Sequence, residues 1–346
     1  MLISSLTNIK KQRDFSFWEN IDSDLISEEL EVLDIKSTLF YIASKSGGTA
    51  ETLALLVVLL NKMEQEGITE QHYKDHLVIT TGEKGDLLKF AKKHQIQTLV
   101  MPENVGGRFG VLTPVGLFPA LFAGIDAEKL LAGAQSCKEK LDEDQSLRSQ
   151  LISMGLELFW QKNHNGKEQT IIMPYSSKLK ELTFWFVQLW AESLGKKLDL
   201  DGKENRTGLT PIASVGAIDQ HSQVQLFMEG PLDKFILFIQ NTNSNHNLDL
   251  KNSIDNDKCQ LLSAFNLHDL MTAELHGTQL AAKDHKVPFA TMRIDQVDAF
   301  HMGELIFFFE VLTMLMGQLF HINPFDQPGV EAGKIYAFKE LRSVKK

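Results

Sequence analysis

The amino-acid sequence predicts an α/β protein with two sets of parallel strands flanked by helices. Three features indicate this fold class: short apolar segments typical of strands, helical patterns that alternate with them, and a long helical stretch between an earlier and a later series. Strands that alternate with helices require right-handed crossovers, which produce parallel sheets covered on both faces. With 346 residues, 43% of them hydrophobic, the chain is long enough for about two domains.

The first series begins with a strand predicted over Thr38–Ala43, whose sequence TLFYIA is apolar and partly β-branched. Small polar residues follow at 44–49, and a helical pattern then continues to about Glu66. The same order repeats, so we expect a strand at His76–Thr81, a helix at Gly85–His94 and a strand at Gln97–Met101.

A helical stretch over about Ala127–Asn163, with a polar break at 142–145, leads into the second series. Its strands are expected at Thr170–Met173, Phe235–Ile239 and Val287–Ile294, with a helical tail from about Gly303. We therefore predict a first domain at 1–145, a second at 146–300 and a C-terminal helical segment at 301–346. The polar segment 241–256 is expected to be a mobile loop.

Charge and cysteine content exclude several classes of protein. Lys and Arg total 35 against 45 Asp and Glu, and the net charge of -10 argues against nucleic acid or an anionic membrane as the main partner. Cys137 and Cys259 are far apart and lack ligand spacing, so neither a disulfide framework nor a zinc site is expected. The start of the chain lacks the apolar core of a signal peptide. We expect a cytoplasmic protein.

The first candidate site is the segment Ser44–Thr49, with sequence SKSGGT, between a predicted strand and a predicted helix. Free backbone N–H groups and the positive end of the helix dipole favour an anion at such a place. The hydroxyl groups of Ser44, Ser46 and Thr49 can donate to phosphate oxygens. The same residue types also form ordinary turns and N-caps, so the pattern alone leaves both readings open. The spacing is not that of a nucleotide-binding P-loop.

The second candidate is Arg108, in the sequence VGGRF just after a predicted strand. Gly106 and Gly107 open space beside its guanidinium, on the side of an open parallel sheet where ligands bind. Taken alone, such an arginine is more often a surface or ion-pair residue.

Glu192 is the third candidate. It follows Leu189 by three positions and Trp185 by seven, and so continues an apolar helical stripe. A buried carboxylate costs free energy unless it has a partner. Glu192 is therefore either a structural hydrogen-bonding group or a base with an adjusted pKa.

His221 and Lys334 complete the set. His221 is expected in the first turn of a helix capped by Asp219, where a lone histidine is usually structural. Lys334 follows Gln327 by seven residues in a helix that opens near Asp326, and two helical turns put both side chains on one face. The alternative for Lys334 is a solvated lysine.

In this order, these segments resemble the motifs of the glucose-6-phosphate isomerase family, which has two domains built from sugar-isomerase modules. The sequence VGGRFGVLTPVGLFPALFAGID at Val105–Asp126 closely resembles one family signature, and INPFDQPGVEAGK at Ile322–Lys334 closely resembles the other. Between them, AESLGK at Ala191–Lys196 and VGAIDQHSQVQLFMEGP at Val215–Pro231 are similar to the segments with the family's base and histidine. The resemblance runs from about Asn20 to Leu341.

The resemblance assigns a role to each candidate. It implies that Ser44, Lys45, Ser46 and Thr49 bind the phosphate, with Gly107 and Gln327 also at the substrate. Arg108 matches the arginine beside the reacting carbons, and Glu192 matches the catalytic base. His221 matches a histidine that assists ring opening from the neighbouring subunit of a homodimer, and Lys334 matches the lysine at the ring oxygen and phosphate.

The implied reaction is the interconversion of glucose 6-phosphate and fructose 6-phosphate in glycolysis and gluconeogenesis. It needs ring opening, then proton transfer between C2 and C1 by one base through a cis-enediol. A fixed cation must stabilise charge on the enediol oxygens, a role that suits Arg108. No metal or redox cofactor is required.

The sequence also departs from the family pattern. The family has a glycine-rich loop of the GIGGS kind, with its strand, before the position of the first predicted strand, and no such loop occurs here. We therefore expect a truncated first domain and a weakened or inactive enzyme unless another chain supplies that part. A non-catalytic phosphosugar-binding module, an inactive fragment and a piece of a fusion protein are the alternatives, and the coding sequence upstream of Met1 would test the last.

Overall fold

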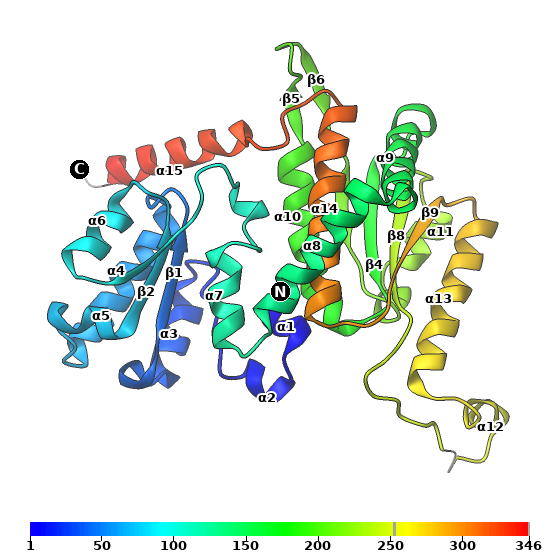
Figure 1. Ribbon diagram of the computed structural model, residues 1–346, viewed down its shortest axis with the longest axis horizontal. Helices are drawn as coiled ribbons and strands as arrows, with labels where there is room; N and C mark the ends of the chain where they lie inside the picture. The colour runs from blue at the N-terminus through cyan, green and yellow to red at the C-terminus, as the bar shows by residue number, and fades with distance from the viewer. Residues whose placement is uncertain (252–253, 345–346) are drawn as a thin grey trace. The chain divides into compact units, whose positions relative to one another are not determined.

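The computed structural model describes residues 1–251 and 254–344, which divide into two compact units (Figure 1). The N-terminal unit comprises Leu2 and Thr7–Ala127. The C-terminal unit comprises Met1, Ile3–Leu6 and the chain from Glu128 onward. Both contain parallel strands with flanking helices, which confirms the predicted fold class. The domain limits at residues 145 and 300 stay predictions.

The N-terminal unit contains a three-stranded parallel sheet in the order β1-β2-β3. The strands are β1 (Phe40–Ser44), β2 (Leu77–Thr81) and β3 (Gln97–Val100), each within two residues of its predicted limits. Ser44 pairs with Thr81, so the loops that follow these strands leave the sheet at the same edge. The helices of this unit are α2 (Ile9–Gln12), α3 (Ser23–Val32), α4 (Ala50–Gln65), α5 (Tyr73–His76), α6 (Asp86–Lys93) and α7 (Pro114–Phe122). The first helix, α1 (Leu2–Leu6), belongs to the C-terminal unit except for Leu2.

The core of this unit lies between α4 and the sheet. Leu56, Leu59 and Met63 recur at helical spacing on α4 and pack in one cluster with Leu77 and Ile79 of β2. All five side chains are at most 5% exposed, and burial of each stabilises the unit by about 1.5–3 kcal/mol. This packing fixes the start of α4 against the end of β1.

The C-terminal unit contains a four-stranded parallel sheet in the order β7-β4-β8-β9. The strands β4 (Gln169–Pro174), β8 (Lys234–Asn241) and β9 (Phe289–Ile294) confirm the predicted ones. The edge strand β7 (Thr210–Ala213) was not predicted, because it has only four residues and contains Pro211, which is tolerated at a sheet edge. The antiparallel pair β5 (Lys196–Leu198) and β6 (Glu204–Thr207) also escaped prediction, because its residues are mostly charged or polar.

Helices cover both faces of this sheet. Ile171 and Phe238 face a cluster that includes Leu275 and Phe227, on α13 (Leu267–Asp284) and α11 (Val224–Glu229). Successive strand residues point to opposite faces, so the buried Ile172 lies on the other face. On that side α10 (Lys180–Leu194) contacts β4 and β7, and α14 (Ala299–Leu319) packs on α10 and on α9 (Gln145–Asn165). The remaining helices are α8 (Ala127–Glu143), α12 (Asp257–Leu262) and α15 (Glu331–Val344).

The predicted polar break in the long helical stretch is Asp144, which separates α8 from α9 and caps α9 through its side chain. The predicted helical tail is two helices: α14 begins at Ala299, and α15 follows a segment without α-helix at 320–330. Among the described helices, α14 is the one long and apolar enough to cross a membrane, but 56% of its apolar window is buried within the protein. Its packing is that of a core helix.

The backbones of α8 and α14 touch at two glycines. A Cβ atom added at Gly133 would lie 1.8 Å from the carbonyl oxygen of Phe300, and one added at Gly303 would lie 1.9 Å from that of Leu130. Either distance is far inside van der Waals contact, so only glycine fits at both positions.

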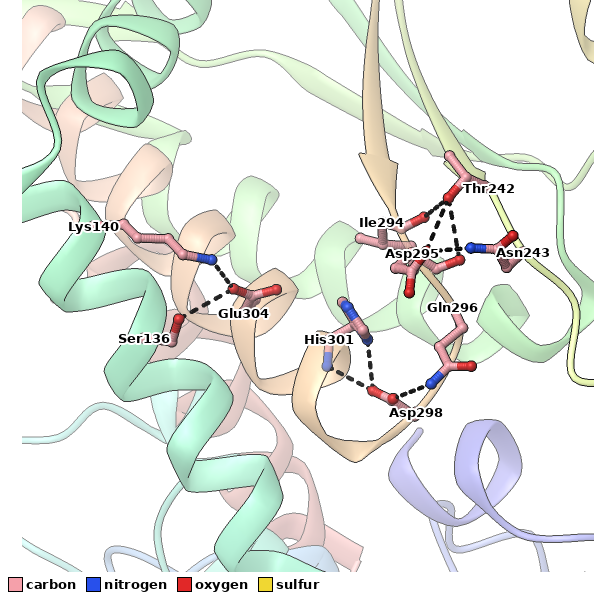
Figure 2. A network of polar contacts seen from close by, with 10 residues as sticks. All are labelled: Ser136, Lys140, Thr242, Asn243, Ile294, Asp295, Gln296, Asp298, His301 and Glu304. Carbon is pink, nitrogen blue, oxygen red and sulfur yellow. Dashed lines mark hydrogen bonds and ion pairs between the residues drawn. The ribbon is translucent and has the colours of Figure 1, made fainter.

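Polar contacts line the carboxyl ends of β8 and β9 (Figure 2). Thr242 and Asn243, just after β8, bond to Asp295 just after β9. The carboxylate of Asp298 caps α14 and lies 2.8 Å from the Nδ1 atom of His301. The start of the predicted loop 241–256 is thus bonded to the sheet, whereas residues 252–253 lie outside the described residues and its mobility stays a prediction.

Candidate functional site

The candidate residues divide between the two units. The N-terminal unit holds Ser44, Lys45, Ser46, Thr49, Gly107 and Arg108, and the C-terminal unit holds Glu192, His221, Gln327 and Lys334.

Three hydroxyl groups meet in the loop between β1 and α4. The Oγ1 atom of Thr49 lies 2.9 Å from the Oγ of Ser44 and 3.4 Å from the Oγ of Ser46, and Ser46 also accepts a hydrogen bond from the N–H of Gly48. Thr49 is the N-cap residue of α4, yet its side chain does not cap the helix. The first N–H groups of α4 therefore keep their donor capacity for an anion.

The loop between β1 and α4, residues 45–49, is called the hydroxyl loop below. The loop that follows β2 supports it through main-chain hydrogen bonds. Gly82 donates its N–H to the carbonyl of Lys45, and Leu87 donates its N–H to that of Gly47. The backbones of the two loops lie close together, because a Cβ atom at Gly85 would lie 2.5 Å from the carbonyl oxygen of Ser46. Gly47 and Gly85 both have positive φ, 63° and 113°, which disfavours other residues there.

Arg108 is buried rather than exposed as an ordinary surface arginine would be. It lies in a short 3₁₀ turn, Gly107–Phe109, in the segment that follows β3, and only 3% of the residue is exposed. Its guanidinium carbon lies 5.5 Å from the centre of the Phe109 ring. A Cβ atom at Gly107 would meet no atom within 4 Å, whereas one at Gly106 would lie 3.3 Å from Cδ2 of Phe109. Of the two glycines predicted to open space, Gly107 does so.

Glu192 lies two residues before the end of α10. It is half-buried, whereas Leu182, Phe186 and Leu189 are fully buried, so Glu192 lies on the flank of the apolar stripe and not within it as predicted. A carboxylate at this edge keeps access to a ligand. The amide of Gln188, one turn earlier, lies 3.5 Å from its Oε2 atom.

Lys196 joins the Glu192 segment to the segment before α15. Its Nζ atom donates to the carbonyl oxygens of Glu192 at 2.8 Å and of Asp326 at 2.7 Å. It also lies 3.5 Å from Oδ1 of Asp326, and its side chain is 5% exposed. Two of the predicted motif segments therefore meet inside the C-terminal unit.

The predicted geometry of Gln327 and Lys334 was wrong. Gln327 has non-helical backbone (φ -149°, ψ 61°) and precedes the 3₁₀ turn Pro328–Val330, so helical spacing does not relate it to Lys334 in α15. Asp326 does not cap this turn and instead accepts from the side chain of Asn323 at 3.1 Å. Lys334 is 56% exposed and pairs with Glu331 at 3.0 Å.

His221 ends a 3₁₀ turn, Ile218–His221, and not the first turn of an α-helix as predicted. Asp219 does not cap that turn. Its carboxylate instead accepts from the N–H of Val215 at 2.7 Å and from the hydroxyl of Ser222 at 2.6 Å. His221 is exposed, and its ring has no hydrogen bond or ion pair within the part of the chain that the structure describes.

A buried polar cluster anchors the His221 turn. The side-chain amide of Gln220 donates to the hydroxyl of Tyr175 at 2.8 Å and to that of Thr278 at 2.9 Å. Gly216 lies flat on the ring of Tyr175, where a Cβ atom would approach to 2.4 Å. The turn that bears His221 is therefore held rigidly to β4 and α13.

Glu192 and His221 lie at opposite edges of the C-terminal sheet. α10 returns antiparallel to β4, and Figure 1 shows it ending beside β5 and β6. Glu192 therefore lies near the amino edge, where β7 begins. His221 comes eight residues after the end of β7 and so lies near the carboxyl edge. The structure brings Glu192 together with the Asp326–Gln327 segment and not with His221 of the same unit.

Sequence reasoning missed two residues beside Glu192. Gln188 is four residues earlier on the same helix, a spacing that could have identified it. Lys196 was quoted within a motif, but its fold-back onto two carbonyls depends on a contact with Asp326, 130 residues away. No local pattern predicts such a contact.

No group of three or more His, Cys, Asp and Glu side chains suited to a metal ion occurs among the described residues. The strongest pKa shift of a carboxyl group belongs to Glu310 of α14. Burial raises the pKa of Glu310 to about 8, and its Oε1 atom has no hydrogen-bond partner among the described residues.

Comparisons with known proteins agree on one family. The family model described as phosphoglucose isomerase matches residues 1–346. A curated glucose-6-phosphate isomerase from Rubrobacter xylanophilus is 39% identical over 327 residues, which cover 94% of this chain and 73% of that relative. A second, from Carboxydothermus hydrogenoformans, is 36% identical over 318 residues, which cover 91% of this chain and 68% of that relative.

Solved structures show the same fold. A crystal structure described as a hypothetical protein from Thermus thermophilus has a TM-score of 0.91 and 34% identity, and the match covers 98% of this chain and 80% of that one. A glucose-6-phosphate isomerase from Chlamydia trachomatis has a TM-score of 0.81 and 25% identity, with 94% of this chain and 63% of that chain covered. The chain therefore belongs to the phosphoglucose isomerase family.

Proposed function

We propose that this chain interconverts glucose 6-phosphate and fructose 6-phosphate. Family membership supports the reaction, since curated relatives of at least 35% identity have this enzyme name. The structural observation that supports it most is the tie between the Glu192 segment and the Asp326–Gln327 segment through Lys196. A non-catalytic phosphosugar-binding module is not favoured by these relatives.

In this proposal Glu192 is the base. Its carboxylate takes the proton from C2 of the open-chain aldose while O1 gains a proton, which gives the cis-enediol. It then returns the proton to C1 while O2 loses its proton, so that the C2–O2 bond becomes the ketose carbonyl. The side-chain amide of Gln188 can hold the carboxylate in one orientation. The flank position of Glu192 suits this role, because a base needs both a partner and access to substrate.

The other residues bind the phosphate or stabilise the charge on the enediol oxygens. Arg108 supplies positive charge to the enediol oxygens, and its burial strengthens that interaction. Ser44, Ser46, Thr49 and Lys45 bind the phosphate at the start of α4, and the binding energy holds the open chain in register with the base. Gly107 leaves room for the substrate. No metal or redox cofactor is part of this proposal.

Ring opening needs a proton carrier at the ring oxygen and the C1 hydroxyl. We assign this step to His221 and Lys334, with Gln327 at the substrate. Because Glu192 and His221 lie at opposite sheet edges of one unit, His221 is proposed to act in the site of the partner subunit of a homodimer. A reducing, cytoplasmic location fits the two cysteines, neither of which forms a disulfide.

A coupled assay of E192Q tests the assignment of the base. We expect kcat to fall at least roughly 100-fold, and incorporation of solvent deuterium at C1 or C2 to fall with it. E181Q is the matched control, because Glu181 lies in the first turn of the same helix and should keep wild-type turnover. Undiminished turnover by E192Q would defeat the proposal.

A mixing experiment tests the shared site. E192Q and H221A are each expected to be nearly inactive, but a heterodimer of the two contains one site with both residues intact if His221 crosses between subunits. Random mixing should then restore up to about a quarter of wild-type activity. Absence of any recovery, with heterodimers present on a native gel, would show that His221 does not complete the partner's site.

A further inference from the structure

Lys196 is a buried cation that the proposed reaction does not use. Its side chain is 5% exposed, and its ammonium donates to the carbonyl oxygens of Glu192 and Asp326. Burial of an ammonium costs several kcal/mol unless its donors are satisfied. An apolar residue would fill the same space without that cost, so packing alone does not explain a lysine here.

The two carbonyls belong to segments that are far apart in the sequence. The carbonyl of Glu192 is in the last turn of α10, where carbonyls lack intrahelical donors and a cation is favoured. Asp326 is about half exposed and lies in the segment between α14 and α15. Lys196 is 130 residues from Asp326 and ties the two segments directly.

The local backbone is shaped for this fold-back. Gly195 ends α10, and a Cβ atom there would lie 2.9 Å from the carbonyl oxygen of Ala191. Gly208 approaches Gly195 so closely that its own Cβ would lie 3.1 Å from the Gly195 Cα. These glycines let the chain turn sharply into β5, so that the Lys196 side chain returns to the helix it has just left.

We propose that Lys196 is a positioning residue for the isomerase reaction. It fixes the main chain at Glu192 to the main chain at Asp326, and so sets the distance between the proposed base and the segment that carries Gln327. It touches neither the substrate nor the reacting atoms. This inference rests on the proposed function, since it has meaning only if Glu192 is the base.

Loss of the Lys196 contacts with Glu192 and Asp326 should slow the proton transfer more than it weakens substrate binding. Displacement of a catalytic group by about 1 Å can cost roughly 100-fold in rate. For K196M we expect kcat to fall about 10- to 100-fold, with KM changed by less than about threefold. K196R should recover part of kcat, because its guanidinium can also donate to two carbonyls.

Lys234 provides a matched control in the same unit. Its side chain is 2% exposed, and it donates to the carbonyl of Pro231 at 2.9 Å and pairs with Asp233. Lys234 begins β8, far along the chain from both Glu192 and Asp326. K234M should therefore lose stability as K196M does, yet the folded protein should keep wild-type kcat.

The kinetic measurements use folded protein at a temperature well below the unfolding midpoint, with E192Q in parallel. An equal kcat for K196M and K234M would overturn the inference, as would a K196M variant whose KM changes while its kcat does not. If K196M does not fold, K196Q decides by the same criteria, because its amide is uncharged and one atom shorter. If E192Q keeps full activity, the proposed function itself fails, and that result is distinct from a failure of Lys196 alone.

Discussion

The hydroxyl oxygens of Ser44 and Thr49 lie 2.9 Å apart at the point where β1 gives way to α4. Thr49 is in the N-cap position but leaves the helix uncapped, so its hydroxyl and the first N–H groups of α4 face the same small region. A tetrahedral anion fits such a set of donors.

We therefore expect T49V to raise KM for fructose 6-phosphate about tenfold, the effect of one lost hydrogen bond to a charged group. The effect on kcat should be smaller, because the phosphate does not react. The coupled assay measures both. T38V is the control: Thr38 lies before β1, at the other end of the strand, where its hydroxyl donates to the carbonyl of Asp34. Similar KM values for the two variants would remove Thr49 from the phosphate site.

The contact of α8 with α14 predicts a large effect on stability. G303A or G133A should lower the free energy of unfolding by at least about 2 kcal/mol, because the helices must separate to admit the methyl group. Urea denaturation measures the change. G277A is the opposite control: Gly277 lies inside α13 with no atom within 4 Å of its Cβ position, so alanine should stabilise by about 0.5–1 kcal/mol. A destabilised G277A together with an unaffected G303A would contradict the close contact.

Glu310 should make stability fall as pH rises. Burial raises its pKa from 4.5 to about 8, so between these values the folded protein holds a proton that the unfolded chain has released. Stability is then fully present below about pH 4.5 and is lost as pH rises through 8, by several kcal/mol at about 1.4 kcal/mol per pKa unit.

Thermal unfolding at pH 5.5 and 8.5 checks this linkage. E310Q should flatten the dependence of stability on pH, because the glutamine side chain has no proton to lose in this range. E143Q, which replaces an exposed carboxylate at the end of α8, should leave it unchanged. An E310Q variant with the wild-type slope would mean that Glu310 is ionised in the folded protein.

The two cysteines should differ in reactivity. Burial raises the pKa of the Cys137 thiol to about 11, with a further contribution from the nearby carboxylate of Glu304. Cys259 is only partly buried. A thiol reagent at pH 8 should therefore modify one cysteine in the folded protein and the second only after denaturation. The variant C259S should lose the early phase; its persistence would assign the early phase to Cys137.

Sequence patterns predicted the strands that lie inside the sheets, because buried strands such as β4 and β8 are continuous apolar runs. They missed β7, an edge strand of four residues that contains Pro211, and the β5–β6 pair, which lies outside the main sheet and is mostly charged or polar. The hydroxyl loop was predictable because its residues are adjacent. The backbone of Gln327 was not, because a regular helix was assumed where the chain makes a 3₁₀ turn. The exposure of Lys334 agrees with the alternative of a solvated lysine.

The loop that carries Ser46 rests on the backbone of its neighbour, with Gly85 pressed against it and no side chain between. A missense change at Gly85 would therefore be scored in an assay as a defect of substrate affinity, although that residue need never meet the substrate. Surveys of variants that inspect only ligand-contacting positions would overlook Gly85, and a design that transfers the proposed phosphate loop to another protein must include both loops.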